Sequence, residues 1–161
     1  MRDRGENRES RAIVIRVLHI DDEAPIRLLA RVNLEWQAEM EVIEAADGLT
    51  GVRLAKRELP DLILLNVNLP RRDGWQVAEE LRTDRETREI PVVFLTARSE
   101  LKDVARGLEL GAVDYITKPF NPLELAPRIR GLLERLERGE RDELLREKIS
   151  ELARLRYVAK K

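Results

Sequence analysis

The chain has 161 residues, of which 43% are hydrophobic and 38% are charged, and this supplies enough apolar material for one domain with a full core. Basic and acidic residues nearly balance at a net charge of −1, so no global field favours nucleic acid or an anionic membrane. The absence of cysteine excludes disulfides, thiolate metal sites and cysteine nucleophiles, and the single histidine, His19, argues against a poly-histidine metal site.

Residues 1–11 mix charges without periodicity, and we expect them to be a disordered tail. The tail has no apolar core of a secretory signal, and no apolar run in the chain reaches the roughly 18 residues of a membrane helix. These features predict a soluble, cytoplasmic protein.

Apolar and amphipathic segments alternate along residues 12–137. The apolar segments predict five buried strands: Ala12–Ile20, Met40–Ala46, Asp61–Val67, Ile90–Ala97 and Ala112–Thr117. The amphipathic segments predict helices that begin near Pro25, Gly48, Trp75, Ser99 and Pro122. Strands that alternate with helices imply right-handed crossovers and a parallel sheet covered on both faces. The sequence therefore predicts a doubly wound, five-stranded parallel α/β domain over residues 12–137.

Residues 138–161 are predicted to form a C-terminal amphipathic helix after a break at Gly139. Its apolar stripe consists of Leu144, Leu145, Ile149, Leu152 and Leu155. A single helix of about 17 residues is marginal in water, so it must fold back on its own domain, pair with a second copy or dock on another protein. Because the stripe has no obvious cover, we expect partner docking or a homodimer, and we expect truncation after Arg138 to leave a folded monomer with a nearly unchanged melting temperature. Only 24 residues follow Glu137, which is too few for a DNA-binding or catalytic domain if the chain is complete.

Polar side chains follow four of the predicted strands at their carboxyl ends, where sites of doubly wound sheets lie. They are Asp21 and Asp22 after the first strand, Asn66 and Asn68 at the third, Thr96 at the fourth and Lys118 at the fifth. Oxygen ligands suit Mg²⁺, and a hydroxyl beside a lysine could stabilise the oxygens of a phosphoryl group. The sequence therefore predicts a magnesium and phosphoryl site at this edge of the sheet.

Four motifs carry a resemblance to a known family. They are HIDDE at residues 19–23, PDLILLNVNLPRRDGW at 60–75, FLTAR at 94–98 and GAVDYITKPF at 111–120. Together they resemble the receiver domain of two-component response regulators over residues 15–137. The resemblance implies a flavodoxin-like receiver fold, a sensor histidine kinase or other signalling protein as partner, and phosphorylation of an aspartate at the end of the third strand.

The resemblance also assigns a role to each matching residue. Asp21, Asp22 and the Asn68 carbonyl would hold Mg²⁺, while Thr96 would contact the phosphoryl group and Lys118 would pair with it. Tyr115 would be the switch aromatic, and Lys118–Pro119 resembles the cis peptide of the family.

The phospho-acceptor position holds Asn66 in place of the family's aspartate. A neutral amide lacks the anionic oxygen that attacks phosphorus, so the chain should not be phosphorylated there. The Asn66 carbonyl oxygen can still contact a cation, and Mg²⁺ binding should weaken. Two interpretations stay open: a natural pseudo-receiver, or a substitution introduced to hold a phosphoreceiver in its unphosphorylated state.

The leading hypothesis is a stand-alone signalling module that acts by protein–protein contact and not an enzyme. The alternative is an Mg²⁺-dependent phosphohydrolase of haloacid dehalogenase type, which would want two aspartates separated by one residue, whereas Asp21 and Asp22 are adjacent. A flavodoxin-like FMN protein would need a phosphate loop after the first strand, where the acidic pair would repel phosphate. We interpret His19 as a hydrogen-bonded core or rim residue, and Trp36 and Trp75 as helix packing residues.

Overall fold

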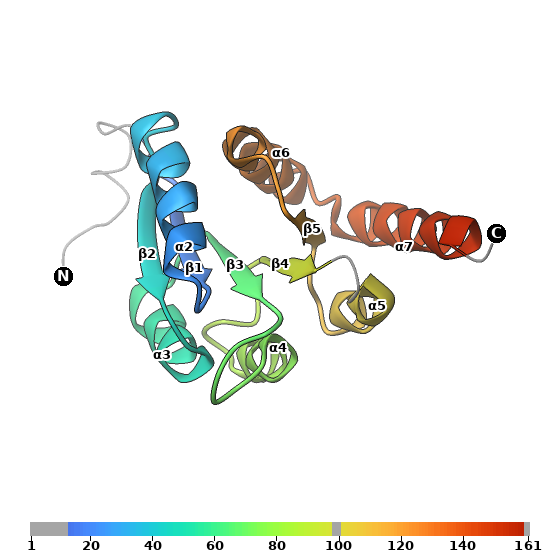
Figure 1. Ribbon diagram of the computed structural model, residues 1–161, viewed down its shortest axis with the longest axis horizontal. Helices are drawn as coiled ribbons and strands as arrows, with labels where there is room; N and C mark the ends of the chain where they lie inside the picture. Colours follow the sequence, from blue (N-terminus) through green and yellow to red (C-terminus); the bar gives the residue numbers. More distant parts are fainter. Residues whose placement is uncertain (1–12, 98–100, 160–161) are drawn as a thin grey trace.

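The computed structural model describes residues 13–97 and 101–159, and it shows a parallel sheet flanked by helices (Figure 1). The five strands, all parallel, are β1 (Arg16–Ile20), β2 (Glu41–Ala45), β3 (Leu62–Asn66), β4 (Val92–Ala97) and β5 (Asp114–Lys118). Their order in the sheet is β2-β1-β3-β4-β5, the order of a flavodoxin-like receiver fold. The predicted fold class is confirmed.

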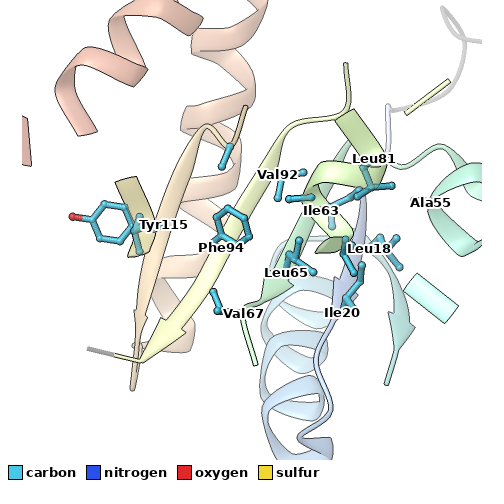
Figure 2. Packing of buried hydrophobic residues seen from close by; sticks show 14 of the residues in the cluster. Leu18, Ile20, Ala55, Ile63, Leu65, Val67, Leu81, Val92, Phe94 and Tyr115 are labelled. Carbon is cyan, nitrogen blue, oxygen red and sulfur yellow. The ribbon is translucent and has the colours of Figure 1, made fainter. Parts of the chain in front are cut away.

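Helices cover both faces of the sheet, as the continuous apolar strands require. One face packs against α3 (Gly48–Glu58), α4 (Gly74–Thr83) and α5 (Leu101–Glu109). The other packs against α2 (Ala24–Arg31), the π-helical turn Val32–Trp36 that extends it, and α6 (Leu125–Glu137). A 3₁₀ turn, Pro122–Glu124, leads into α6, and α7 (Arg141–Ala159) follows it. Figure 2 shows the first of these two cores, in which Leu18, Ile63 and Phe94 are fully buried.

Local chemistry fixes where several helices begin and end. The Asp47 carboxylate accepts a 2.8 Å hydrogen bond from the backbone N–H of Thr50 and caps α3. Asp73 and Gln76 form a reciprocal capping box at the start of α4. Gly111, with φ +97°, turns the chain after α5.

Helix α7 lies along the outer edge of β5, the strand at the end of the sheet (Figure 1). Leu144 is buried in the core that α2 and α6 cover, and Leu152 is buried in the core that α3, α4 and α5 cover. The expectation of an uncovered leucine stripe is therefore wrong for these two residues, because β5 is an edge strand whose flanks need cover. The expectation that truncation after Arg138 leaves the melting temperature nearly unchanged stays a prediction, and the burial of Leu144 and Leu152 argues against it.

Two other expectations need correction, and two fall outside the described residues. Strand β1 begins at Arg16, four residues later than predicted, because neighbouring strands first offer partners there, and Ile13 is exposed. Trp36 is 81% exposed and packs in no core, whereas Trp75 packs against Phe94 as expected, with the rings tilted by 54° and their centroids 4.7 Å apart. The expected tail at 1–11 and the expected helix start at Ser99 lie outside the described residues.

Across residues 13–97 and 101–159, no helix combines the length and the apolar content needed to cross a membrane.

Gly74 allows the first turn of α4 to approach the end of β3 closely. A Cβ at this position would lie 2.5 Å from the Asn66 carbonyl oxygen and 2.8 Å from the Val67 Cα, and backbone atoms cannot yield cheaply. We predict that Gly74→Ala lowers the free energy of unfolding by about 2 kcal/mol or more. The matched control is Gly131→Ala in α6, where nothing lies within 4 Å of the added carbon and a gain of about 0.5–1 kcal/mol is expected. Urea unfolding of both variants is the measurement, and equal effects would contradict the close-approach account.

Candidate functional site

The candidate site lies where the strand order reverses, at the carboxyl ends of β1 and β3. Asp21 and Asp22 directly follow β1, and Asn66 is the last residue of β3. Lys118 ends β5 and reaches the same point from two strands away. These residues meet because parallel strands deliver their ends to one edge of the sheet.

The Asn66 amide is the centre of the site. Its Nδ2 donates hydrogen bonds to Asp21 Oδ1 at 3.3 Å, to Asp22 Oδ1 at 3.1 Å and to the backbone carbonyl of Asn68 at 3.0 Å. The side chain is buried, with 5% of the residue exposed. One neutral NH₂ group thus joins the loop after β1 to the loop after β3.

Asp21 is fully buried and stays ionised because of its neighbours. Burial alone favours the neutral carboxyl group, but His19, the backbone N–H of Glu23 and Lys118 together outweigh it and hold the pKa of Asp21 below its usual range. The Glu23 N–H donates at 2.9 Å to Oδ1, and Lys118 Nζ donates at 3.0 Å to Oδ2. The site therefore contains an ion pair between the buried Asp21 and the partly buried Lys118.

Sequence reasoning missed the contact that His19 makes with this site. His19 is fully buried, and Nε2 lies 3.6 Å from Asp21 Oδ2, while neither ring nitrogen has a hydrogen-bond partner among the described residues. The interpretation of His19 as a core residue holds, but the hydrogen bonds expected for it are not there. Side chains two residues apart on an extended chain point to the same side, so the spacing of His19 and Asp21 was the sequence signal for this contact.

Two candidate residues lie apart from the Asn66 contacts. Thr96 is fully buried near the end of β4, one residue beyond Leu95, the register partner of Asn66, and its hydroxyl donates to the Ala97 carbonyl at 3.2 Å. Tyr115 lies three residues before Lys118 on β5, and its hydroxyl points away from Phe94 (Figure 2). Its ring lies beneath α7, with Lys148 Nζ 5.8 Å from the ring centroid. The Lys118–Pro119 peptide is cis, as the resemblance implied.

The oxygen atoms of the site are of the kind that Mg²⁺ prefers as ligands, but here they accept hydrogen bonds from the Asn66 amide. Asp21, Asp22 and the Asn68 carbonyl all point at the amide nitrogen, which occupies the position where their oxygens converge. Within residues 13–97 and 101–159, no group of three or more His, Cys, Asp or Glu side chains is arranged to hold a metal. A cation would have to displace the amide donor, for example by turning the amide so that Oδ1 faces the carboxylates.

Comparison with known proteins gives a consistent result. The family model described as "Response regulator receiver domain" matches residues 17–130. The DNA-binding dual master transcriptional regulator RpaA of Synechocystis sp. is 45% identical over 123 residues, which cover 76% of this chain and 51% of that protein. The phosphate regulon transcriptional regulatory protein PhoB of Escherichia coli is 47% identical over 121 residues, covering 75% and 52%. The chain thus spans about half the length of these curated relatives.

Solved structures agree with the fold. A putative response regulator from Chloroflexus aurantiacus is similar with a TM-score of 0.71 at 32% identity, over 76% of this chain and 100% of that one. The chemotaxis response regulator CheY4 of Vibrio cholerae has a TM-score of 0.69 at 28% identity, over 74% and 99%. The comparisons favour a receiver over a haloacid dehalogenase phosphohydrolase or an FMN protein.

The amide contacts predict how stability responds to metal. Asn66→Asp would place a third carboxylate against Asp21 and Asp22, so we predict that it lowers the free energy of unfolding by about 1–3 kcal/mol without metal. Millimolar Mg²⁺ should restore this loss, because a cation that binds only the folded state stabilises it. The parent should change by less than about 0.5 kcal/mol.

Thermal melts at matched ionic strength are the measurement. Asp22→Ala in the Asn66→Asp background is the control, and it should remove the response to Mg²⁺. A parent chain that gains as much from Mg²⁺ as the Asn66→Asp variant would show that the amide does not take the place of the cation.

The lowered pKa of Asp21 predicts an acid-sensitive contribution to stability. Because the pKa is lower in the folded chain than its ordinary 3.8, the stabilisation is complete above that value and is lost as the pH falls through the folded pKa. Asp21→Asn should therefore be less stable than the parent by about 1–3 kcal/mol at pH 7. Urea titrations between pH 7 and 2 should show the two curves converge below about pH 4. Parallel curves at every pH would contradict this account.

Proposed function

The chain belongs to the response regulator receiver domain family, and we propose that it works as a receiver whose pocket is held in one state by Asn66 and whose output is protein–protein contact. The observation that carries the proposal is that the two N–H groups of the Asn66 amide face three oxygens, one each from the Asp21 and Asp22 carboxylates and the Asn68 carbonyl, so the pocket supplies its own donor to these groups. The chain also has Thr96 and Lys118 at the positions where the family resemblance expects residues that contact a phosphoryl group. We infer a binding module and not an enzyme.

The chemistry of phosphoryl transfer explains why Asn66 blocks it. In the family an aspartate attacks phosphorus with an anionic oxygen and becomes an acyl phosphate. The Asn66 nitrogen has a delocalised lone pair and already donates toward three oxygens, while its neutral carbonyl oxygen is a poor nucleophile. The amide cannot attack phosphorus whether Asn66 is native or introduced. We therefore propose that the pocket operates as a pseudo-receiver.

We propose that Mg²⁺ binds this pocket weakly. The residues that would hold it are Asp21, Asp22 and the carbonyl oxygens of Asn66 and Asn68, and a bound ion would supply positive charge for phosphoryl oxygens. Without an ion, Lys118 neutralises Asp21 and the Asn66 amide orients Asp22. The pocket is therefore organised by its own side chains.

Partners follow from the family and remain proposals. Receivers interact with histidine kinases, so we propose a sensor kinase or another signalling protein as the partner, in the cytoplasm. The names of RpaA and PhoB describe transcriptional regulation and, for RpaA, DNA binding. This chain matches only about half of each, and we propose for it the receiver's contact function.

Acetyl phosphate with Mg²⁺ tests the proposal directly. We predict that the intact mass of the parent stays unchanged, because Asn66 lacks a nucleophilic carboxylate. Asn66→Asp should gain one phosphoryl group that hydroxylamine removes. Asn66→Ala serves as the matched control without either group and should stay unmodified. Phosphorylation of the parent would overturn the blocked-pocket proposal, and an inert Asn66→Asp variant would show that the pocket differs from a competent receiver beyond this residue.

A further inference from the structure

The outer edge of β5, with α5 and α6 on either side, forms a surface that α7 covers. We call the part of β5, α5 and α6 that lies under α7 the edge surface. Leu144 of α7 belongs to the core that contains Leu132 of α6. Leu152 of α7 belongs to the core that contains Tyr115 of β5 and Leu108 of α5. An amphipathic helix is the natural occupant, because it covers both flanks of an edge strand at once.

Charge complementarity makes the edge surface specific for α7. Asp114 on β5 is 1% exposed, and Lys148 of α7 lies 3.0 Å from it, beside Arg128 of α6 at 2.9 Å. Arg135 of α6 forms a two-bond contact with Glu147 of α7 at 2.7 and 2.8 Å. The surface thus offers an acid opposite the lysine of α7 and a base opposite its glutamate.

A single glycine sets the path that returns α7 to its own domain. Only residues 138–140 separate α6 from α7, and Gly139 in their middle has φ +76°. Two backbone hydrogen bonds close the turn, from the Gly139 N–H to the Leu136 carbonyl and from the Glu140 N–H to the Arg135 carbonyl, both at 3.0 Å, and no atom lies within 4 Å of a Cβ built at Gly139. With Gly139 in a helical conformation, α6 and α7 would run on as one helix, and α7 would leave its own edge surface.

The apolar stripe of α7 is also only partly used by its own domain. Ile149 is 48% exposed and Leu155 is 40% exposed, in contrast to the buried Leu144 and Leu152. Leu144 and Leu152 therefore provide the apolar contacts with the edge surface, and Ile149 and Leu155 would keep their exposure if α7 were exchanged.

We propose that the edge surface accepts α7 from a second copy of this chain, and that two copies exchange their α7 helices reciprocally by straightening at Gly139. The contacts Lys148–Asp114 and Glu147–Arg135 would then form between chains in place of within one. Such an exchange produces a two-fold dimer in which each interface is the one already seen in the monomer. The proposal is independent of phosphorylation at position 66.

Gly139→Ala tests the hinge. Alanine disfavours the positive φ of the closed turn and favours a continuous helix, and two hinges change per dimer, so the dimerisation constant should rise about tenfold or more. Gly131→Ala in α6 is the matched control, since it adds the same helix preference away from the turn and should leave the constant unchanged. Sedimentation equilibrium of the full chain measures both. A dimerisation constant unchanged in Gly139→Ala, or raised equally by both variants, would overturn the hinge.

Charge reversal tests the exchange itself. Glu147→Arg places two cations together in its own closed chain, and Arg135→Glu places two acids together. When the two variants are mixed, each α7 finds its complement on the other chain, so native mass spectrometry should show a heterodimer in excess of either homodimer.

The double variant Glu147→Arg with Arg135→Glu restores the pair within one chain and serves as the control, with a dimer content like that of the parent. Homodimers without an excess of heterodimer would place the contact elsewhere and overturn the proposal, as would monomers in every sample.

Discussion

The site depends on one constraint, which is that the buried carboxylate of Asp21 must be satisfied inside the protein. A fully buried carboxylate is costly unless it is paired and hydrogen-bonded, and Asp21 is held by Lys118, the Glu23 N–H and the Asn66 amide. These partners come from β5, from the loop after β1 and from β3. Because each partner arrives on a different element, the ionisation of Asp21 connects the carboxyl ends of the sheet.

Asn66 changes how that constraint is met. A carboxylate at this position would add charge that a cation must neutralise, whereas the amide adds a donor and no charge. With one Lys118 ammonium against Asp21 and Asp22, the described pocket carries a smaller excess of negative charge than three carboxylates would. The same substitution removes the nucleophile and supplies an internal donor for the remaining acid groups.

Sequence patterns predicted the architecture well, because the apolar strands and the rule for parallel crossovers leave few alternatives. They also predicted that Asp21, Asn66 and Lys118 would converge, since all three end strands of one sheet. Sequence patterns could not predict that the Asn66 nitrogen donates to the acidic residues, because this depends on how the side-chain amide is oriented. The cover over β5 was also missed, since a leucine stripe shows that α7 needs a partner but not which surface supplies it. The interpretation of Trp36 as a packing residue was wrong for a related reason, because helical spacing does not show which face of a helix packs against the sheet.

Strand β5 connects the pocket with the edge surface. Its last residue, Lys118, binds Asp21 in the pocket, while Asp114 and Tyr115 at its other end lie under α7. Burial and the nearby Glu151 of α7 raise the pKa of Tyr115 to about 12, so its hydroxyl stays neutral under the helix at ordinary pH. The five residues of β5 therefore make one contact with Asp21 in the pocket and two contacts with Lys148 of α7. A shift of β5 along its axis would disturb both ends together, because the pocket that contains the Asn66 amide and the helix α7 both contact this one strand.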